Sequence, residues 1–135
     1  MSFALRNAVP MSLRVPLYWG VTALVALAFI VPGVGNLVHA PHIAGDMARL
    51  GYPPYVMTLL GTWKLLGAAA ILLPGLPRLK EWAYAGMVFD LTGGAASRAW
   101  TGDAAVTIVI PLVIAGFVLA SWALRPAGRS LPVAA

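Results

Sequence analysis

Four apolar stretches, each about long enough to cross a lipid bilayer, constrain the fold of this 135-residue chain more than any other feature. They cover residues 16–38, 54–73, 81–100 and 104–124. A transmembrane helix needs about 20 mostly apolar residues, because the hydrocarbon core is roughly 30 Å thick and each helical residue advances about 1.5 Å. A content of 61% hydrophobic and 10% charged residues is typical of membrane proteins. We therefore predict four membrane-spanning helices in a single domain over residues 1–135.

The first stretch has an alternative interpretation as a signal peptide. Arg6 and Arg14 precede it, and the triplet Val38-His39-Ala40 follows it like a cleavage site. The apolar region of a signal peptide is only about 7–15 residues long, however, and this stretch is longer. We therefore interpret it as a span.

Basic residues divide unequally between the two ends of such a bundle. Helices joined by short turns pack antiparallel, so the N-terminus, residues 74–80 and the C-terminus share one side. Cytoplasmic segments of membrane proteins are enriched in lysine and arginine. We predict an all-α, antiparallel four-span bundle in a bacterial inner membrane, with both termini cytoplasmic. The predicted cytoplasmic side carries Arg6, Arg14, Arg78, Lys80, Arg125 and Arg129, against Arg49 and marginally Arg98 on the other.

Several kinds of site are excluded by residue content. The chain has no cysteine, which removes thiol chemistry, iron–sulfur clusters and cysteine-type zinc sites. The net charge of +5 forms no basic stripe, so we expect no nucleic-acid partner. A bis-histidine haem is not expected, because neither His39 nor His42 lies in a span. Together with Asp46, these histidines show only a generic metal-ligand spacing, so we expect no metal there. We expect the connection 39–53, in which they lie, to contain a short interfacial helix.

Two opposite charges fall near the middle of neighbouring predicted spans. Lys64 lies nine residues before the end of the second span, and Asp90 lies nine residues after the start of the third. Both are therefore roughly 13 Å from the same edge of the membrane. A charge at that depth costs from about 2.5 to more than 10 kcal/mol, so we expect the two to face each other or a wet cavity.

Three interpretations of these charges remain open from the sequence. Lys64 and Asp90 could form a structural clip that fixes helix register, a functional centre for a ligand, quinone or proton, or no direct pair. Small residues share their faces and predict close helix approach. These are Gly61 and Ala68 on the second span, and Ala83, Gly86, Gly94 and Ser97 on the third.

Three further charged residues have simpler expected roles. Glu81 lies at the first turn of the third predicted helix, where a carboxylate suits the helix dipole and can meet Lys80 or Arg78. Arg98 either reaches the outer surface or points inward. Asp103 is close enough in sequence to pair with Arg98 or to cap the fourth helix.

The segment from Leu50 to Asp103 resembles the DoxX-like family of small four-helix membrane proteins. It carries LGYPPY, GTWKLLGA, PRLKEWAYAG, FDLTGGAAS and a closing GD, which are specific in combination. The resemblance implies a four-span bundle related to DoxX and to the DoxD-type subunit of thiosulfate:quinone oxidoreductase. It places Lys64, Glu81, Asp90, Ser97 and Asp103 at motif positions. Many relatives have a histidine after the motif serine, and Arg98 stays protonated, so no proton-transfer role is expected at position 98.

Three functions fit these expectations. The first is an accessory subunit of a quinone-linked membrane redox system, although the chain itself has no cofactor-binding motif. Lys64 or Asp90 would then hydrogen-bond a quinone oxygen, Trp63 and Tyr84 would pack against its ring, and Ser97 and Arg98 are further candidate ligand contacts. The second is an assembly module that docks a partner span, such as an oxidoreductase subunit, and does no chemistry. The third is a small-molecule carrier that uses the Lys64 and Asp90 site and works as a homo-oligomer.

Overall fold

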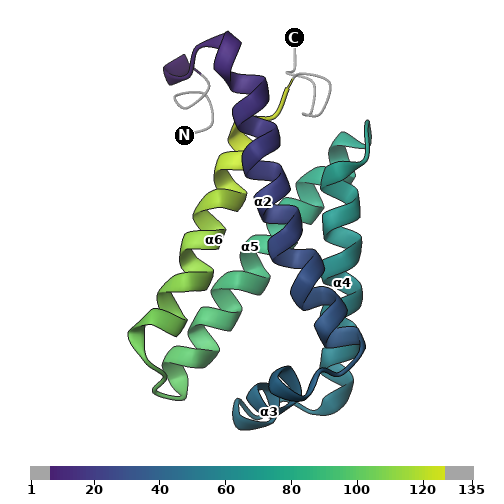
Figure 1. Cartoon of the computed structure of the whole chain (residues 1–135), viewed down its shortest axis with the longest axis vertical. Coiled ribbons are helices and arrows are strands. Elements are labelled where there is room, and N and C mark those ends of the chain that lie inside the picture. Colours follow the sequence, from purple (N-terminus) through teal and green to yellow (C-terminus); the bar gives the residue numbers. More distant parts are fainter. Residues whose placement is uncertain (1–6, 127–135) are drawn as a thin grey trace.

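A computed structural model describes residues 7–126, and this part of the chain is helical with no strand. Within residues 11–123, four long helices and one short helix make up the fold (Figure 1). The short helix confirms that a short helix lies within residues 39–53, as expected. The elements are α2 (Met11–Leu37), α3 (Pro41–Arg49), α4 (Pro54–Leu72), α5 (Pro77–Trp100) and α6 (Ala105–Ala123).

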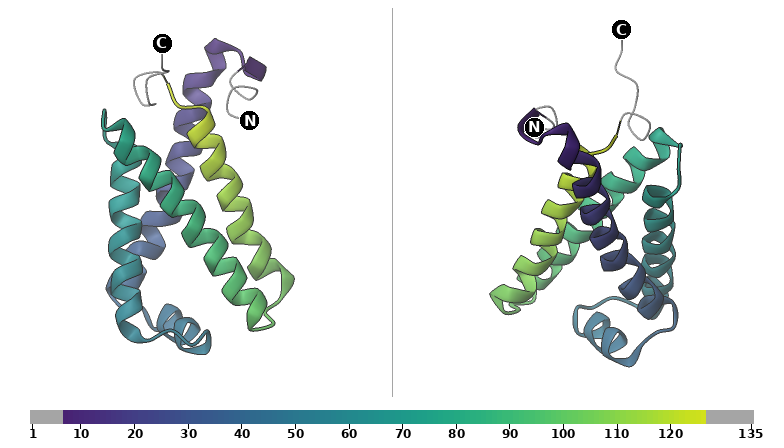
Figure 2. Two further views of the ribbon diagram at one scale, coloured as in Figure 1. Left: turned by 180° about the vertical axis from the view of Figure 1, so that it is seen from behind. Right: turned by 45° about the horizontal axis from the view of Figure 1, so that its top comes forward.

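Consecutive long helices run in opposite directions (Figure 1). Helix α2 packs most extensively against α4, and α5 packs against α6; α2 also contacts α6, and α4 contacts α5. Figure 2 shows that α5 is inclined to α4, so that the two meet near their connecting turn and separate toward the end where α3 lies. The fold is thus two helix pairs that are close at one end and apart at the other.

Proline residues set where several helices begin, because a proline at the first helical position lacks only an N–H that would be unpaired anyway. Helices α3, α4 and α5 all start with proline. Helix α5 therefore begins at Pro77, one turn before the predicted start at residue 81. Helix α2 begins at Met11, before the predicted start at residue 16, and it continues through both Pro16 and Pro32.

Three helices, α2, α4 and α6, are long and apolar enough to cross a membrane. Helix α5 has 24 residues, which is sufficient length, but it does not belong to this set among the described residues. The reason is its polar content, since it carries Arg78, Lys80, Glu81, Asp90 and Arg98. By composition the structure thus supports three of the four predicted spans.

The closest helix contact is between α2 and α4. A Cβ atom added at Gly61 would lie 2.8 Å from the carbonyl oxygen of Gly33 and 2.8 Å from Leu37 Cγ. A Cβ atom added at Gly33 would in turn lie 3.2 Å from Lys64 Cβ and 3.2 Å from Leu65 Cδ2. The close approach expected on the second span is confirmed at Gly61, and it fixes Lys64 against α2.

Candidate functional site

Lys64 and Asp90 form an ion pair between α4 and α5. Lys64 Nζ donates a hydrogen bond to Asp90 Oδ2 at 2.5 Å, and the two side chains are 15% and 23% exposed. The ammonium group also lies 5.5 Å from the centroid of the Phe29 ring, within the range of a cation–π interaction. The expected direct contact is confirmed. The interpretation in which Lys64 and Asp90 do not pair is therefore excluded, and the pair is either a structural clip or a functional centre.

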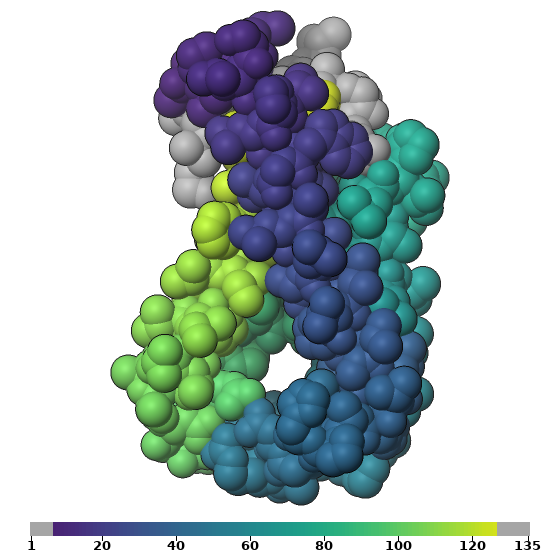
Figure 3. All heavy atoms as spheres, viewed as in Figure 1, coloured from purple at the N-terminus to yellow at the C-terminus, as the bar shows by residue number. Residues whose placement is uncertain are grey.

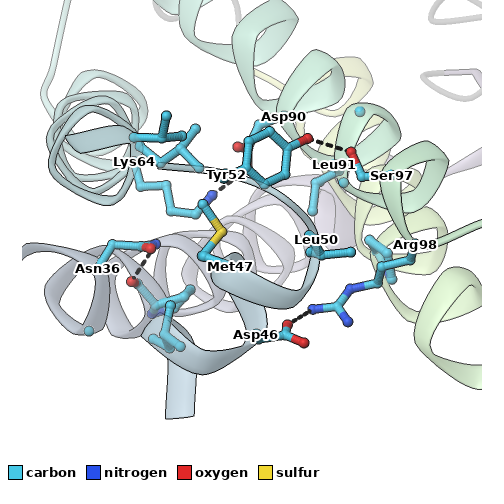
Figure 4. A pocket seen from close by; sticks show the side chains of 18 of the residues that line it. Asn36, Asp46, Met47, Leu50, Tyr52, Lys64, Asp90, Leu91, Ser97 and Arg98 are labelled. Atoms are coloured by element: carbon cyan, nitrogen blue, oxygen red, sulfur yellow. Dashed lines mark hydrogen bonds and ion pairs between the residues drawn. The ribbon is translucent and has the colours of Figure 1, made fainter. Parts of the chain in front are cut away.

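A large cavity opens on one side of this pair; its surface is mostly apolar, but it includes several charged and polar side chains, and we call it the polar cavity for these. Its volume is about 1140 Å³, and it is lined by α2, α3, α4, α5 and one residue of α6. Figure 3 shows the hollow where the two helix pairs diverge, with α3 closing the far end. Figure 4 shows Lys64, Asp90, Tyr52 and Ser97 around the cavity. The cavity therefore follows from the inclination of α5 relative to α4.

Polar contacts join α3 to the end of α5 across the mouth of this cavity. Arg98 bonds to Asp46, and Arg49 reaches Asp103 Oδ1 at 2.5 Å. Arg98 also reaches Asp103 at 3.2 Å, and Arg49 reaches Asp46 at 2.7 Å. The hydroxyl groups of Tyr52 and Ser97 are 2.5 Å apart. We call these residues the strap, and its members are Asp46, Arg49, Tyr52, Ser97, Arg98 and Asp103.

The strap keeps its two carboxyl groups charged. Hydrogen bonds from Arg49 are the largest influence on Asp103 and lower its pKa to about 2. Partial burial raises the pKa of Asp46, but hydrogen bonds from Arg49 and Arg98 outweigh that effect and leave the pKa below its usual value. Conversely, hydrogen bonds to Asp103 and Asp46 raise the pKa of Arg49. The carboxyl groups of Asp46 and Asp103 are therefore ionised at neutral pH.

One buried polar atom beside the pair has no hydrogen-bond partner. The Asn36 side chain is 5% exposed and lines the cavity, and its amide nitrogen donates to the Pro32 carbonyl oxygen at 2.9 Å. Its Oδ1 atom has no partner within the described chain. Because the carbonyl of Pro32 can only accept, the amide orientation is fixed and Oδ1 is the atom left over. Asn36 thus borders the cavity, but its unpartnered Oδ1 atom is buried and is not exposed to it.

An apolar groove opens on the other side of the ion pair, between α4 and α5. Its volume is about 710 Å³, and it runs along α4 from Leu60 to Leu73. Its rim carries Trp63 and Trp82, which are 67% and 76% exposed. The groove and the polar cavity share Leu60, Lys64, Phe89 and Asp90. The ion pair therefore stands in the wall between the two spaces.

The structure brings most of the predicted site residues to these two spaces. Trp63 lines the groove, whereas Ser97 and Arg98 line the cavity as members of the strap. Tyr84 lines neither, because it is 3% exposed and its hydroxyl lies 2.8 Å from Ser121 Oγ. Six residues separate it from Asp90, which is about one and two-thirds helical turns, so it points away from the pair. The expectation that Tyr84 packs against a ligand ring is therefore not met.

Two small residues of α5, Gly86 and Gly94, do not serve close packing, contrary to the prediction, whereas Ala83 packs against the hydrophobic core. Cβ atoms added at Gly86 or Gly94 would meet nothing within 4 Å. Gly86 lines the groove, and Gly94 lines the cavity. Their small size therefore keeps the two spaces open beside Asp90.

The polar residues at the opposite end of α5 also differ from expectation. Glu81 is not a helix cap: its carboxylate pairs with Arg125 at 2.6 Å and accepts from Trp122 Nε1 at 2.8 Å. Lys80 is fully buried, and its Nζ donates to the carbonyl oxygens of Ala70, at 2.8 Å, and Leu73. It thereby satisfies carbonyl groups at the end of α4. From the sequence, Lys80 was expected only to help set the orientation of the bundle.

The connection before α4 contains no arrangement suited to a metal. His39 lies beside Thr58, with Nε2 3.0 Å from Oγ1. Over residues 7–126, no group of three or more histidine, cysteine, aspartate or glutamate side chains could hold a metal ion.

Sequence analysis missed four residues of the site, namely Asn36, Asp46, Arg49 and Tyr52. The sequence places Asp46 in a generic metal-ligand spacing and gives Arg49 only a role in the orientation of the bundle. The two residues are three apart on α3, and their charges complement those of Arg98 and Asp103. That complementarity was the signal available in the sequence. Nothing in the sequence predicted the unpartnered oxygen of Asn36.

The comparisons with known proteins identify a family. No curated protein and no solved structure gives a significant match to this chain. The sequence profile of the DoxX-like family matches residues 20–121, which include most of α2 and α6 and all of α3, α4 and α5. The chain therefore belongs to the DoxX-like family of membrane proteins.

Proposed function

We propose that α2, α4, α5 and α6 all cross the membrane, with the start of α2 and the end of α6 on the cytoplasmic side of a bacterial inner membrane. The difficulty is α5, whose charges oppose insertion of the helix alone. Its midspan charge, Asp90, is neutralised by Lys64, and Arg98 is neutralised by Asp46 and Asp103. In the assembled bundle, Asp90 and Arg98 are therefore paired charges rather than free ones.

We further propose that the protein binds a quinone-class molecule at Lys64 and Asp90, as an accessory subunit of a membrane redox system. The observation that carries this proposal is the position of the ion pair in the wall between a polar cavity and an apolar groove. Pockets that bind small molecules are largely apolar with a few convergent polar groups. Here the polar groups are a donor, Lys64, and an acceptor, Asp90.

The chemistry of the chain's own residues would be binding and orientation. Lys64 has hydrogen-bond donors besides the one that reaches Asp90, and it can donate to a quinone oxygen. The Asp90 carboxylate holds the ammonium group in place. Phe29, Phe89 and Trp63 supply apolar surface for the ring. Electrons would pass between the bound quinone and the oxidoreductase that the protein accompanies, while protons would come from water in the cavity.

The cavity also favours a second candidate function, that of a small-molecule carrier. Spaces on both sides of a midplane ion pair, with a strap across one mouth, resemble a binding site with two routes of access. Transporter sites lie near the middle of the bilayer at interfaces between helices. Uptake of a labelled solute by vesicles containing the purified protein would favour this function over the redox one.

The redox proposal is tested by quinone reduction in membranes from cells lacking the protein. We expect a lower rate, restored by the wild-type chain and not by a Lys64→Met plus Asp90→Leu double variant of normal abundance. Gly116→Ala is the control, because Gly116 lines neither space and a Cβ there meets nothing within 4 Å. An unchanged rate after removal of the protein would refute the proposal. Crosslinking in the same membranes should recover one dominant oxidoreductase partner.

A further inference from the structure

The polar cavity and the apolar groove meet at the ion pair, so one ligand can occupy both. Four residues line both spaces: Leu60 and Lys64 on α4, and Phe89 and Asp90 on α5. From Lys64 the groove continues to Leu73. Nine residues of helix correspond to about 14 Å, which is long enough for an extended hydrocarbon chain rather than for a ring alone.

The charges around the cavity determine what kind of head group fits there. Three cationic and three anionic side chains are paired with one another, which leaves no formal net charge. An anionic or cationic ligand would need to break one of these pairs. A neutral group that donates and accepts hydrogen bonds needs no such rearrangement. The six side chains are Lys64, Arg49 and Arg98, and Asp90, Asp46 and Asp103.

The groove carries fewer polar groups than the cavity. Apart from Lys64 and Asp90 at its end, it is lined by apolar, aromatic and small side chains, including Trp63, Leu66 and Trp82, all largely exposed. If α4 and α5 cross the membrane, this open side faces lipid. Gly86 keeps the groove open beside Asp90, since a Cβ there would meet nothing within 4 Å.

We infer that the ligand is a neutral amphiphile that binds across both spaces and enters sideways from the bilayer. Its hydrogen-bonding head lies in the cavity beside Lys64 and Asp90. Its hydrocarbon tail lies in the groove between α4 and α5, under Trp63 and Trp82. This inference rests on the proposed function and narrows it: the quinone-class ligand is a tailed, membrane-dissolved one rather than a small water-soluble one.

Binding of a matched pair of probes tests the inference in lipid nanodiscs. Decylubiquinone carries a tail, and 2,3-dimethoxy-5-methyl-1,4-benzoquinone has the same ring without it. Quenching of tryptophan fluorescence reports binding. Gly86→Leu fills the groove, Gly94→Leu fills the cavity, and Gly116→Leu is the matched control, because all three glycines border open space. Nanodiscs without protein correct for partition of the tailed probe into lipid.

The variants should separate the two spaces. We expect Gly86→Leu to weaken decylubiquinone binding about tenfold, equivalent to about 1.4 kcal/mol, and to leave the tailless probe unchanged. Gly94→Leu should weaken both probes, and Gly116→Leu neither. A photoreactive group at the end of the decyl tail should label α4 near Leu73 and α5 near Leu79.

Two results would overturn the inference without touching the proposed function. Equal affinity for the two probes, with no effect of Gly86→Leu, would show that the tail has no site. Labelling of α3 by the end of the tail would show that the ligand lies in the reverse orientation. Failure of both probes to bind would overturn the inference and the proposed function together.

Discussion

At the scale of single residues, Lys64 and Asp90 depend on each other energetically. Lys64→Met leaves the Asp90 carboxylate without its cation, and Asp90→Leu leaves the ammonium group without its anion. Removing one partner of a buried ion pair costs about 3–5 kcal/mol, whereas replacing both with apolar residues is often neutral. We expect each single variant to have a low folded yield and a lowered thermal midpoint in detergent. The double variant should recover both.

The double variant also separates a structural clip from a functional centre. If folding recovers and quinone binding is lost, the pair serves the ligand. If both folding and binding recover, the pair only fixes helix register. A double variant that folds no better than the singles would mean that their interaction energy is negligible, despite the 2.5 Å contact.

At the scale of helices, glycine positions that look alike in sequence have opposite roles. A Cβ at Gly61 would overlap the carbonyl oxygen of Gly33 and the backbone nitrogen of Leu37, whereas a Cβ at Gly116 meets nothing. Overpacking costs about 1–3 kcal/mol, while replacing an open helical glycine with alanine gains up to about 1 kcal/mol. Thermal unfolding in detergent should show Gly61→Ala destabilised and Gly116→Ala unchanged or stabilised. Equal midpoints for the two variants would contradict the close packing of α2 on α4.

Helix α3 is held to α5 mainly by charge, so the strap should open in acid. The folded-state pKa of Asp103 is lowered to about 2 from an ordinary value near 3.8. The contribution of its carboxylate is therefore complete above pH 4 and is lost as the pH falls through about 2. The same direction holds for Asp46. Spin labels on Ala48→Cys and Trp100→Cys should give a narrow distance distribution at pH 5 and a broad, longer one near pH 2.

The control for this experiment is Asp103→Asn, which removes the carboxylate at every pH. Its distance distribution should be broader than that of the wild type at pH 7, where Asp46 still pairs with Arg98, and should change less on acidification. A wild-type distribution that stays narrow down to pH 2 would mean that packing, rather than the ion pairs, holds α3 in place.

The sequence predicted features that belong to single helices, but it did not predict the open spaces between helices. The places of the four long helices and the level positions of Lys64 and Asp90 follow from apolar run length and the rise per residue, whereas the short α3 is expected from the content of the connection 39–53. The inclination of α5 does not follow from these properties. Because of that inclination, Gly86 and Gly94 line open spaces instead of packing against a neighbouring helix. The inclination of α5 depends on long-range contacts, which no local sequence pattern predicts.

At the scale of the whole molecule, the two helix pairs are joined differently at their two ends. At one end the core packs apolar side chains, including Phe29, Ile71 and Val118. At the other end the strap joins α3 to α5 across a cavity. Packed contacts resist opening because every neighbour must move, whereas an ion-paired strap can exchange its partners for water. Any opening of the cavity is therefore expected at the α3 end.

The proposed orientation makes these two ends face different compartments. The end with Arg14, Arg78 and Arg125 should be cytoplasmic, because lysine and arginine are retained on that side. The chain has no cysteine, so single cysteines report accessibility without background. In sealed right-side-out vesicles, an impermeant maleimide should label Ala48→Cys on α3 at once and Leu76→Cys in the α4–α5 turn only after the membrane is permeabilised. Labelling of both cysteines in sealed vesicles would mean that α4 does not cross, and the reverse pattern would invert the proposed topology.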